Sequence, residues 1–590
     1  ASLLMVPSTY EPGKLYNVLP SGNRAPDNKG GAGYDQTRAD FDFDRGSNAA
    51  ATRINSSGLI EKYRENKLLQ SNNFGTTWTT SDLSVTSGQS GYDGTNNAWL
   101  LNSSVSGGYL RQNLSGVIGV NTYSFYVKAG SVDWVKSTGF GNTYFDLSGS
   151  GSVGTTPTIA NIESVGGGWF RCSVTGSTSP SQVRIYPASG DGVDASGSIL
   201  IQSAQAESGL VATDYLNSTS VTAKAGVLID LPRINYDANG ENGALLLEPS
   251  RQQLLQFSEY FGDSYWTKSG ASVVGGFTSP EGLSNAYKLV EDTSTGDKNI
   301  FTSSISITNS TSYSIHHYIK AGEKEIVGIQ DVINSQYWAS IDLINGVVLD
   351  EKTSGSTKVE PLINGYYKVS YPFISNTTSI RPSIFLLPDS YTTGRPSDQD
   401  YTGDGTSGVY IFGAMLEAGS YSTSYIPNHG ESGGVTRAAD SCSVTGASDV
   451  IGQTEGTLYG EINPFQSTGA SIISISDGTN DNRILFSVNT DNKYSMFVQA
   501  TTVQLNLETS GGFSLGAYHK FALRYSENDF KLFVDGSLQL SSTSGSVPSN
   551  LSEVEFYNPS GSAGFYGDTK ELIVFPTALT DSELATLTTL

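Results

Sequence analysis

Polar and apolar residues alternate along most of this chain. In residues 123–127 (YSFYV) and 366–371 (YYKVSY), every second side chain is apolar. A period of two over about five to eight residues, bounded by Gly and Asn, is typical of half-buried strands in a β-sandwich. Sandwiches of roughly 150–180 residues with about eight or more strands fit a jelly roll. We therefore predict an all-β chain that contains jelly-roll sandwiches.

The pattern occurs twice in the same order. Residues 121–130 (NTYSFYVKAG) match 311–322 (TSYSIHHYIKAG), and four further segments match on either side of this pair. Among them, 68–70 matches 254–256, at an offset of 254 − 68 = 186 residues, and 201–209 matches 411–419, at an offset of 411 − 201 = 210. The chain thus contains one domain twice, with loop insertions in the second copy.

A different series of strands follows the second copy. Alternation in SIISIS (471–476), HKFALRY (519–525) and FKLFV (530–534) predicts successive strands, and ELIVF (571–575) the last one. Residues 580–587 (TDSELATL) have the start of a helix, with Thr580 or Asp581 as its N-cap. Residues 1–50 have one strand-like patch, 40–45 (DFDFDR), and too few apolar residues for a core of their own, so we expect them to dock elsewhere.

These observations divide the chain into four parts. We predict an N-terminal anchoring segment, two jelly-roll repeats and a C-terminal sandwich, at residues 1–50, 51–220, 221–435 and 436–590.

The charge of the chain excludes some partners. It has 34 Lys and Arg against 57 Asp and Glu, a net charge of −23, which disfavours nucleic acid and anionic membrane surfaces. Only 15% of the residues are charged, so the surface must be rich in Ser, Thr and Asn, as outside the cell. We see no apolar run of the ~18 residues that a membrane helix needs, and residues 1–7 lack the pattern of a secretory signal.

The two cysteines give no covalent framework. Cys172 and Cys442 fall in different predicted domains, and Cys172 matches Val369 in the other repeat. It alternates inward with Phe170 and Val174, so we interpret it as a small core residue. A disulfide and a cysteine-based metal site are both disfavoured.

Comparison of the copies separates core aromatics from candidate contacts. Three positions are aromatic in both copies and are assigned to the core, as is an apolar fourth: Trp78/Trp266, Trp99/Tyr287, Trp169/Tyr366 and Trp134/Ile326. Tyr337 and Trp338 match Gly141 and Asn142 instead, so we predict that they contact a carbohydrate or another subunit. In the insertion-rich loop of the second copy, Tyr391 and Tyr401 are weaker candidates.

Two acidic loops suit a hard cation such as Ca²⁺. Oxygen-rich loops are the usual ligands of calcium, and the candidate ligands are Asp398, Asp400 and Asp404 in one loop, and Asp477, Asp481 and Asn482 in the other. Neither loop has EF-hand spacing, and Asp-Gly steps are also ordinary turn formers. Both interpretations stay open at this stage.

We find no signature of catalysis in the sequence. A Gly-x-Ser-x-Gly elbow, a phosphate-binding Gly loop and a His-Glu-x-x-His motif are all missing. A glycosidase needs only two carboxylates at a set separation, which a sequence cannot exclude. We predict a protein that is not an enzyme.

Several segments resemble modules of bacteriophage virion proteins. The resemblance rests on 400–424 (DYTGDGTSGVYIFGAMLEAGSYSTS), 245–256 (LLLEPSRQQLLQ) and 53–61 (RINSSGLIE). Such proteins are fibres, spikes and head-decorating appendages built of domains similar to carbohydrate-binding jelly rolls. Residues 519–536 and 571–587 resemble a laminin-G or concanavalin-like lectin sandwich.

The resemblance implies a non-enzymatic structural protein at the virion surface. In this hypothesis residues 1–50 contact other virion proteins, the sandwiches bind host-surface carbohydrate, and the chain forms a homo-oligomer, with a trimer as the commonest arrangement. One alternative is a purely structural capsid or tail decoration protein without a ligand. A polysaccharide-degrading tail protein is the other.

Overall fold

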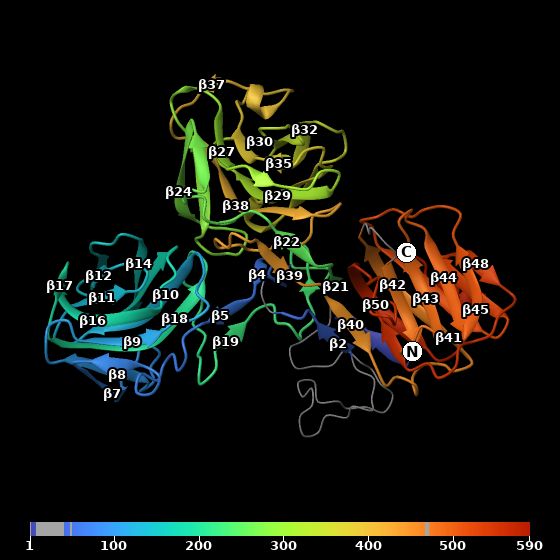
Figure 1. The fold of residues 1–590 in the computed structure, drawn as a ribbon, viewed down its shortest axis with the longest axis horizontal. Coiled ribbons are helices and arrows are strands. Elements are labelled where there is room, and N and C mark those ends of the chain that lie inside the picture. Colours follow the sequence, from blue (N-terminus) through green and yellow to red (C-terminus); the bar gives the residue numbers. More distant parts are fainter. Residues whose placement is uncertain (1, 8–40, 48–49, 466–470) are drawn as a thin grey trace.

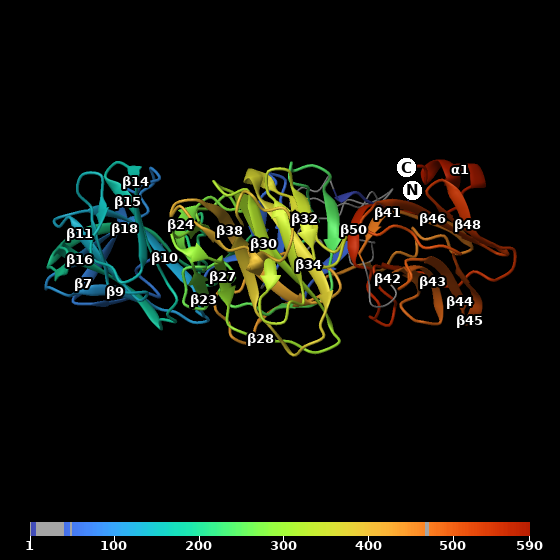
Figure 2. The same ribbon diagram turned by 90° about the horizontal axis from the view of Figure 1, so that it is seen from above.

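The computed structural model describes residues 2–7, 41–47, 50–465 and 471–590. Figure 1 shows three lobes made almost entirely of strands, and Figure 2 shows them side by side along the long axis. The lobes are sandwiches of antiparallel sheets, which confirms the predicted fold class of two tandem jelly rolls followed by a concanavalin-like sandwich. No helix of the described residues is long and apolar enough to cross a membrane.

The first lobe, called unit one, has two sheets. One sheet has the order β14 (Ile159–Gly166), β15 (Trp169–Gly176), β10 (Asn121–Ala129), β18 (Gly197–Ser208), β8 (Ala98–Ser103) and β7 (Leu83–Gln89). The other has the order β13 (Ser152–Val153), β12 (Thr143–Asp146), β11 (Trp134–Thr138), β16 (Gln182–Gly190), β9 (Tyr109–Asn113) and β6 (Thr79–Ser81), with β17 (Val193–Asp194) beside β16.

The second lobe, unit two, repeats both strand orders. One sheet has the order β33 (Lys358–Pro361), β34 (Tyr367–Ile374), β29 (Ser312–Ala321), β38 (Gly408–Ala418), β25 (Ala286–Glu291) and β24 (Ala271–Phe277). The other has the order β32 (Val347–Glu351), β31 (Trp338–Asp342), β30 (Ile326–Asp331), β36 (Pro382–Leu386), β27 (Lys298–Thr302) and β23 (Trp266–Ser269). Short pairs and single turns complete it: β26 (Thr295–Gly296) with β37 (Tyr401–Thr402), β28 (Ile305–Ser306) with β35 (Ser379–Ile380), η2 (Ile363–Gly365) and η3 (Pro396–Asp398). The duplication predicted from the sequence is confirmed.

The two units also share local details. A bulge interrupts the pairing of β10 with β18 at Ser203, and the same bulge lies at Gly413 between β29 and β38; φ is 54° at Ser203 and 55° at Gly413. The Leu68 N–H donates to Asn66 Oδ1, and the Leu255 N–H donates in the same way to Gln253 Oε1. Leu68 is therefore equivalent to Leu255, so its sequence pairing with Leu254 is wrong by one residue.

The third lobe is the C-terminal sandwich, which takes strands from elsewhere in the chain. One sheet has the order β20 (Ile234–Asn235), β21 (Ala244–Leu247), β50 (Gly567–Phe575), β41 (Glu455–Pro464), β46 (His519–Ser526), β47 (Asp529–Val534) and β48 (Ser537–Ser542), with β1 (Leu3–Met5) also on β50. The other has the order β2 (Phe41–Asp44), β40 (Ser441–Val444), β49 (Glu553–Glu555), β42 (Ser471–Ser476), β43 (Asn482–Val488), β44 (Tyr494–Ala500) and β45 (Thr502–Glu508). The C-terminal helix α1 (Asp581–Leu587) begins with a capping box between Thr580 and Glu583, as its sequence predicts.

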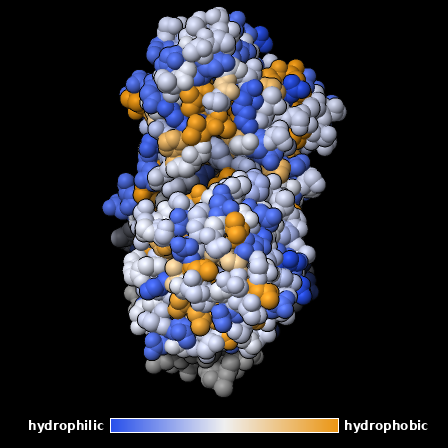
Figure 3. Space-filling model, turned by 90° about the vertical axis from the view of Figure 1, so that its left-hand side faces the viewer, coloured by the Kyte–Doolittle hydropathy of each residue, from blue (hydrophilic) through white to orange (hydrophobic). Residues whose placement is uncertain are grey.

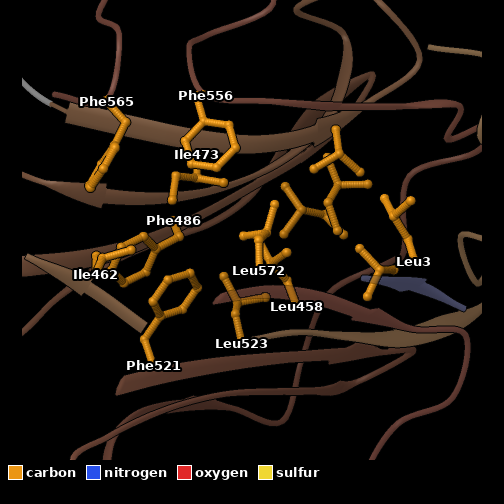
Figure 4. Packing of buried hydrophobic residues seen from close by; sticks show 14 of the residues in the cluster. Leu3, Leu458, Ile462, Ile473, Phe486, Phe521, Leu523, Phe556, Phe565 and Leu572 are labelled. Atoms are coloured by element: carbon orange, nitrogen blue, oxygen red, sulfur yellow. The ribbon is translucent and has the colours of Figure 1, made fainter. Parts of the chain in front are cut away.

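The described parts of the N-terminal segment belong to this sandwich. Leu3 of β1 pairs with Val574 and is buried in the core beside Leu458 and Leu572 (Figure 4). Strand β2 confirms the strand-like patch and pairs with β40. Residues 8–40 lie outside the described part of the chain. Contact of this segment with virion proteins stays a prediction, but its two strands are core elements of the same chain.

Short strand pairs connect the lobes. They are β3 (Thr52–Ile54) with β4 (Ile60–Lys62), β5 (Arg64–Asn66) with β19 (Ala223–Ala225), and β22 (Arg251–Gln253) with β39 (Val435–Arg437). The β3–β4 hairpin precedes unit one but packs on unit two, where Ile60 joins a buried cluster with Tyr318 and Phe412. The β20–β21 hairpin precedes unit two and pairs with β50 of the C-terminal sandwich. Each leading hairpin thus fastens its unit to the next lobe.

Candidate functional site

Two of the predicted aromatic contacts lie in the core. Tyr337 is 0% exposed and its ring packs 5.7 Å from that of Tyr371 and 5.2 Å from that of Phe373. Tyr391 is 6% exposed, and its hydroxyl donates to the Gly394 carbonyl at 2.7 Å. Neither ring offers a face to a ligand, so the prediction is wrong for both. Tyr337 belongs to the core of unit two, and Tyr391 packs with Phe385 and Leu387.

Trp338 and Tyr401 are half-buried and stay predicted contacts. The Tyr401 hydroxyl donates to Glu291 Oε2 at 2.5 Å, and Lys324 Nζ lies 4.8 Å from the centre of its ring. One face of Tyr401 is therefore already used within the chain.

Hydrogen bonds within each predicted calcium loop hold that loop in the conformation of a turn. Asp404 accepts from the N–H groups of Thr406 and Ser407 at 2.7 Å each, and Asp477 accepts from the Thr479 N–H at 2.9 Å and from Asn482 at 2.8 Å. These bonds lower the pKa of both carboxyl groups.

The other predicted calcium ligands do not converge either. Asp398 forms an ion pair with Arg395 at 3.1 Å, and Asp400 and Asp481 bring no third carboxylate to either loop. Among the described residues, no three His, Cys, Asp or Glu side chains could hold a metal ion. The turn interpretation accounts for both loops, and calcium binding there stays a prediction.

A different surface gathers chemically useful groups. In unit one, the sheet that runs from β13 to β6 buries alternate residues, such as Leu110 of β9 and Ile185 of β16. The residues between them point outward because successive side chains of a strand lie on opposite faces. We call this outer surface the row face, since strand register arranges its side chains in rows.

Register defines three rows across the row face. The aromatic row is Tyr144, Lys136, Tyr186 and Tyr109; the arginine row is Thr138, Arg184, Arg111 and Thr79; the amide row is Gln182 and Asn113. Trp134 of β11 lies beside the aromatic row, next to Lys136.

The aromatic row is held by cation–ring contacts. Lys136 Nζ lies 5.5 Å from the centre of the Tyr144 ring and 4.7 Å from that of Tyr186, while the Tyr186 and Tyr109 rings are 5.2 Å apart. Asp194 accepts from Lys136 and from the Tyr144 hydroxyl, each at 3.0 Å. Burial and this hydrogen bond raise the pKa of Tyr144. The row is therefore held by contacts within the chain, and Tyr144 and Tyr186 are only 8% and 7% exposed.

The arginine row leaves donor groups free. The Arg184 guanidinium lies 4.7 Å from the centre of the Tyr109 ring and donates to the Tyr186 hydroxyl at 3.2 Å, which raises the pKa of Arg184. Arg111 donates to Thr79 Oγ1 and to Gln182 Oε1, both at 3.0 Å. A guanidinium has five N–H donors, so both groups keep several for a ligand.

Unit two covers the equivalent face. Its loop from β36 to β38 runs over 387–407, whereas the equivalent loop of unit one is only 191–196. The longer loop contains η3, which contacts β30 and β31, and Tyr391, which packs with Phe385 and Leu387. The face is open in unit one because that insertion is missing there.

Sequence reasoning missed the row face and misplaced Trp134. The structure confirms the match of Trp134 with Ile326, but both are half-buried on outer sheet faces, so the core assignment of Trp134 is wrong. The core assignment is confirmed for Trp78, Trp266 and Tyr287, and Trp99 packs half-buried against the same core as Trp78. Trp169 and Tyr366 are less than 5% exposed but lie outside the two sandwich cores. The sequence does contain a signal for the row face. Arg111 and Arg184 are charged in unit one, whereas the equivalent residues of unit two are Phe301 and Ser383.

A cavity of about 520 Å³ lies between units one and two. Figure 3 looks onto unit one and shows the hollow beneath unit two. Among its lining residues, Lys62 donates to Glu259 at 2.8 Å and lies 2.6 Å from Glu281. Burial raises the pKa of Glu281 to about 7. The Asn285 Oδ1 atom beside it is buried and accepts no hydrogen bond from the described chain.

The C-terminal sandwich is similar to a known superfamily. Residues 437–585 match the Laminin_G_3 family model, described as the concanavalin A-like lectin/glucanases superfamily. This part of the chain is therefore a concanavalin-like sandwich, as its sequence predicted. A search of curated protein sequences gave no match.

Several solved structures are similar to part of this chain. One is the CBM40 of the Ruminococcus gnavus IT-sialidase bound to α2,3-sialyllactose, at 19% identity over 24% of this chain and 87% of that chain, with a TM-score of 0.22. Another is domain 4 of AbnA, a GH43 extracellular arabinanase from Geobacillus stearothermophilus, in complex with arabinotriose, at 15% identity over 25% and 73%, with a TM-score of 0.22. Each of these two structures is similar to about a quarter of this chain.

Proposed function

We propose that this chain is a non-catalytic carbohydrate-binding protein and that the row face is its main contact with a glycan. One observation carries the proposal: in unit one Tyr109, Arg111 and Arg184 are only half-buried beside the amide row, whereas unit two covers the equivalent sheet with its long loop. Sugar rings stack their C–H groups on aromatic faces, and amide and guanidinium groups hydrogen-bond to sugar hydroxyls. The lectin-type match of residues 437–585 supports the same class of function.

The row face has the groups for binding but not for glycoside hydrolysis. The carboxylates at its margin, Asp146, Asp191 and Asp194, each accept hydrogen bonds within the chain, from Ser148, Thr155 and Lys136. A glycosidase needs one carboxyl group as acid and a second one as base or nucleophile, both facing the sugar. This arrangement favours adhesion over the polysaccharide-degrading alternative.

The setting that we propose is the surface of a bacteriophage virion. It rests on the sequence resemblance of residues 53–61, 245–256 and 400–424 to virion modules. Host-surface glycans are then the partners, and several weak sites on one particle would gain from multivalency. Labelling of intact particles with an antibody against the chain tests this setting, and particles without label would contradict it.

Binding to a glycan array tests the function itself. The full chain should bind a subset of oligosaccharides, and Tyr109→Ala or Trp134→Ala should weaken that binding about tenfold or more because each removes a stacking surface worth about 1.5 kcal/mol. Tyr63→Ala is the matched control, since Tyr63 is a half-buried tyrosine in the link outside the row face. Equal losses in the control, or no binding by the unaltered chain, would refute the proposal.

A further inference from the structure

The arginine row contains an unusual juxtaposition of like charges. Arg111 of β9 and Arg184 of β16 are direct register partners, and both side chains point to the outer side of the sheet. Like charges directly opposite each other destabilise an antiparallel pair. A negatively charged group beside the two arginines would offset this repulsion.

The described chain supplies no such group. The partners of Arg111 are neutral oxygens of Thr79 and Gln182, and Arg184 contacts only the tyrosines at 109 and 186. Several other arginines lie in ion pairs with carboxylates, although Arg171 and Arg483 also have neutral partners; the paired ones include Arg53, Arg233, Arg395, Arg437 and Arg524. Carboxylates are not scarce, since the chain carries a net charge of −23.

The fold itself does not require these arginines. Unit two has Phe301 where unit one has Arg111, and Ser383 where it has Arg184, within the same strand order. That pair carries no charge and lies in the unit whose insertion covers part of the same sheet. The arginines are therefore a property of the open face and not of the sandwich.

We propose that Arg111 and Arg184 bind the anionic group of a sugar, either a carboxylate or a sulfate ester. This inference rests on the proposed function and adds the class of ligand. Guanidinium groups bind carboxylate and sulfate through paired N–H donors, which gives both strength and orientation. A sugar held in this way lies beside Tyr109, whose ring Arg184 contacts, with its hydroxyls near Gln182 and Asn113 in the amide row.

Calorimetric titration with matched sugars tests the inference. The probes are a galacturonic acid trisaccharide, its methyl ester, neutral galactotriose and a sulfated galacto-oligosaccharide, each added to the full chain. We expect at least one anionic probe to bind tenfold or more tightly than its neutral counterpart, and the stronger of the two identifies the anionic group. Arg111→Gln/Arg184→Gln should remove this preference, while Lys128→Gln, on the opposite sheet of unit one, should keep it.

Each outcome separates the inference from the proposed function. If neutral and anionic sugars bind equally well, the arginines do not select charge, and the inference fails while carbohydrate binding stands. If no probe and no array glycan binds, the proposed function fails, and the inference with it. Stabilisation by inorganic sulfate without binding of any anionic sugar would also overturn it. Arg184→Lys keeps the charge but not the paired donors, so it should lose most of the preference even if the double variant unfolds.

Discussion

Both units contain a sheet with the same strand order, and differences at single residues change what its outer face presents. Lys136 in unit one has Gly328 as its counterpart, and any side chain at Gly328 would collide with Pro396 of the covering loop, because a Cβ added there would lie 2.5 Å from the proline side chain. Glycine there lets the insertion lie on the sheet of unit two, whereas lysine braces two tyrosines in unit one, where the insertion is missing. The residue at this register position thus fits the loop of its own unit.

Unit two also differs from unit one by two buried histidines. His316 and His317 of β29 are at most 1% exposed, and no ring nitrogen of either has a hydrogen-bond partner in the described chain. Burial lowers the pKa of His317 to about 3 and that of His316 well below its usual value, with Lys368 adding to the effect on His316. The register equivalents in unit one are Ser124 and Phe125, which do not titrate.

We therefore expect acid to destabilise unit two selectively. Each histidine has its ordinary pKa near 6.5 when unfolded and a lower one when folded, so the unfolded state binds more protons below pH 6.5. Stability is full above about pH 6.5 and falls as the pH drops towards 3, by up to about 1.4 kcal/mol per pH unit for each histidine. Calorimetry at pH 7.5 and pH 5 should show one transition shifting downward, and His316→Ser/His317→Phe should reduce the shift. An unchanged shift in that variant would contradict the assignment.

At the scale of elements, periodicity predicts strands well but not their partners. The strands at 471–476, 519–525 and 571–575 were predictable because alternation is a local signal. The pairing of Leu3 with Val574 was not, since nothing in a three-residue strand specifies a partner so distant in the sequence. The row face escaped prediction for a related reason: its rows combine residues from five strands whose register only the folded sheet defines.

Strand β1 should contribute measurably to the C-terminal sandwich. Leu3 is 1% exposed and lies in its core, so Leu3→Ala should lower the free energy of unfolding of this lobe by about 2–5 kcal/mol. Leu4, on the opposite face of the same strand, is only half-buried, so Leu4→Ala should cost less. Hydrogen exchange on β50 reports the loss locally. Equal effects of both substitutions would mean that β1 adds backbone pairing without core packing.

At the scale of the whole molecule, the lobes are joined by hairpins that carry buried charge. Lys62, at the end of the β3–β4 hairpin, reaches Glu259 and Glu281 of unit two, whose side chains are 1% and 2% exposed. A second buried cluster of Arg45, Arg233, Glu248, Arg437 and Asp440 lies where unit two meets the C-terminal sandwich. These joints set the direction in which the row face points relative to the rest of the chain.

Lys62→Met should loosen the joint between units one and two. Removal of one partner leaves two buried carboxylates without compensation, which costs about 3–5 kcal/mol, and the hairpin should then detach from unit two. Small-angle scattering should show a larger radius of gyration, and calorimetry should separate the melting of the two units. Arg53→Met in the same hairpin is the control, because Arg53 and Glu61 are 22% and 28% exposed and such pairs contribute at most about 1 kcal/mol. If both variants behave like the unaltered chain, the joint is held by the apolar contacts of Ile60 and not by Lys62, and the orientation of the row face does not depend on buried charge.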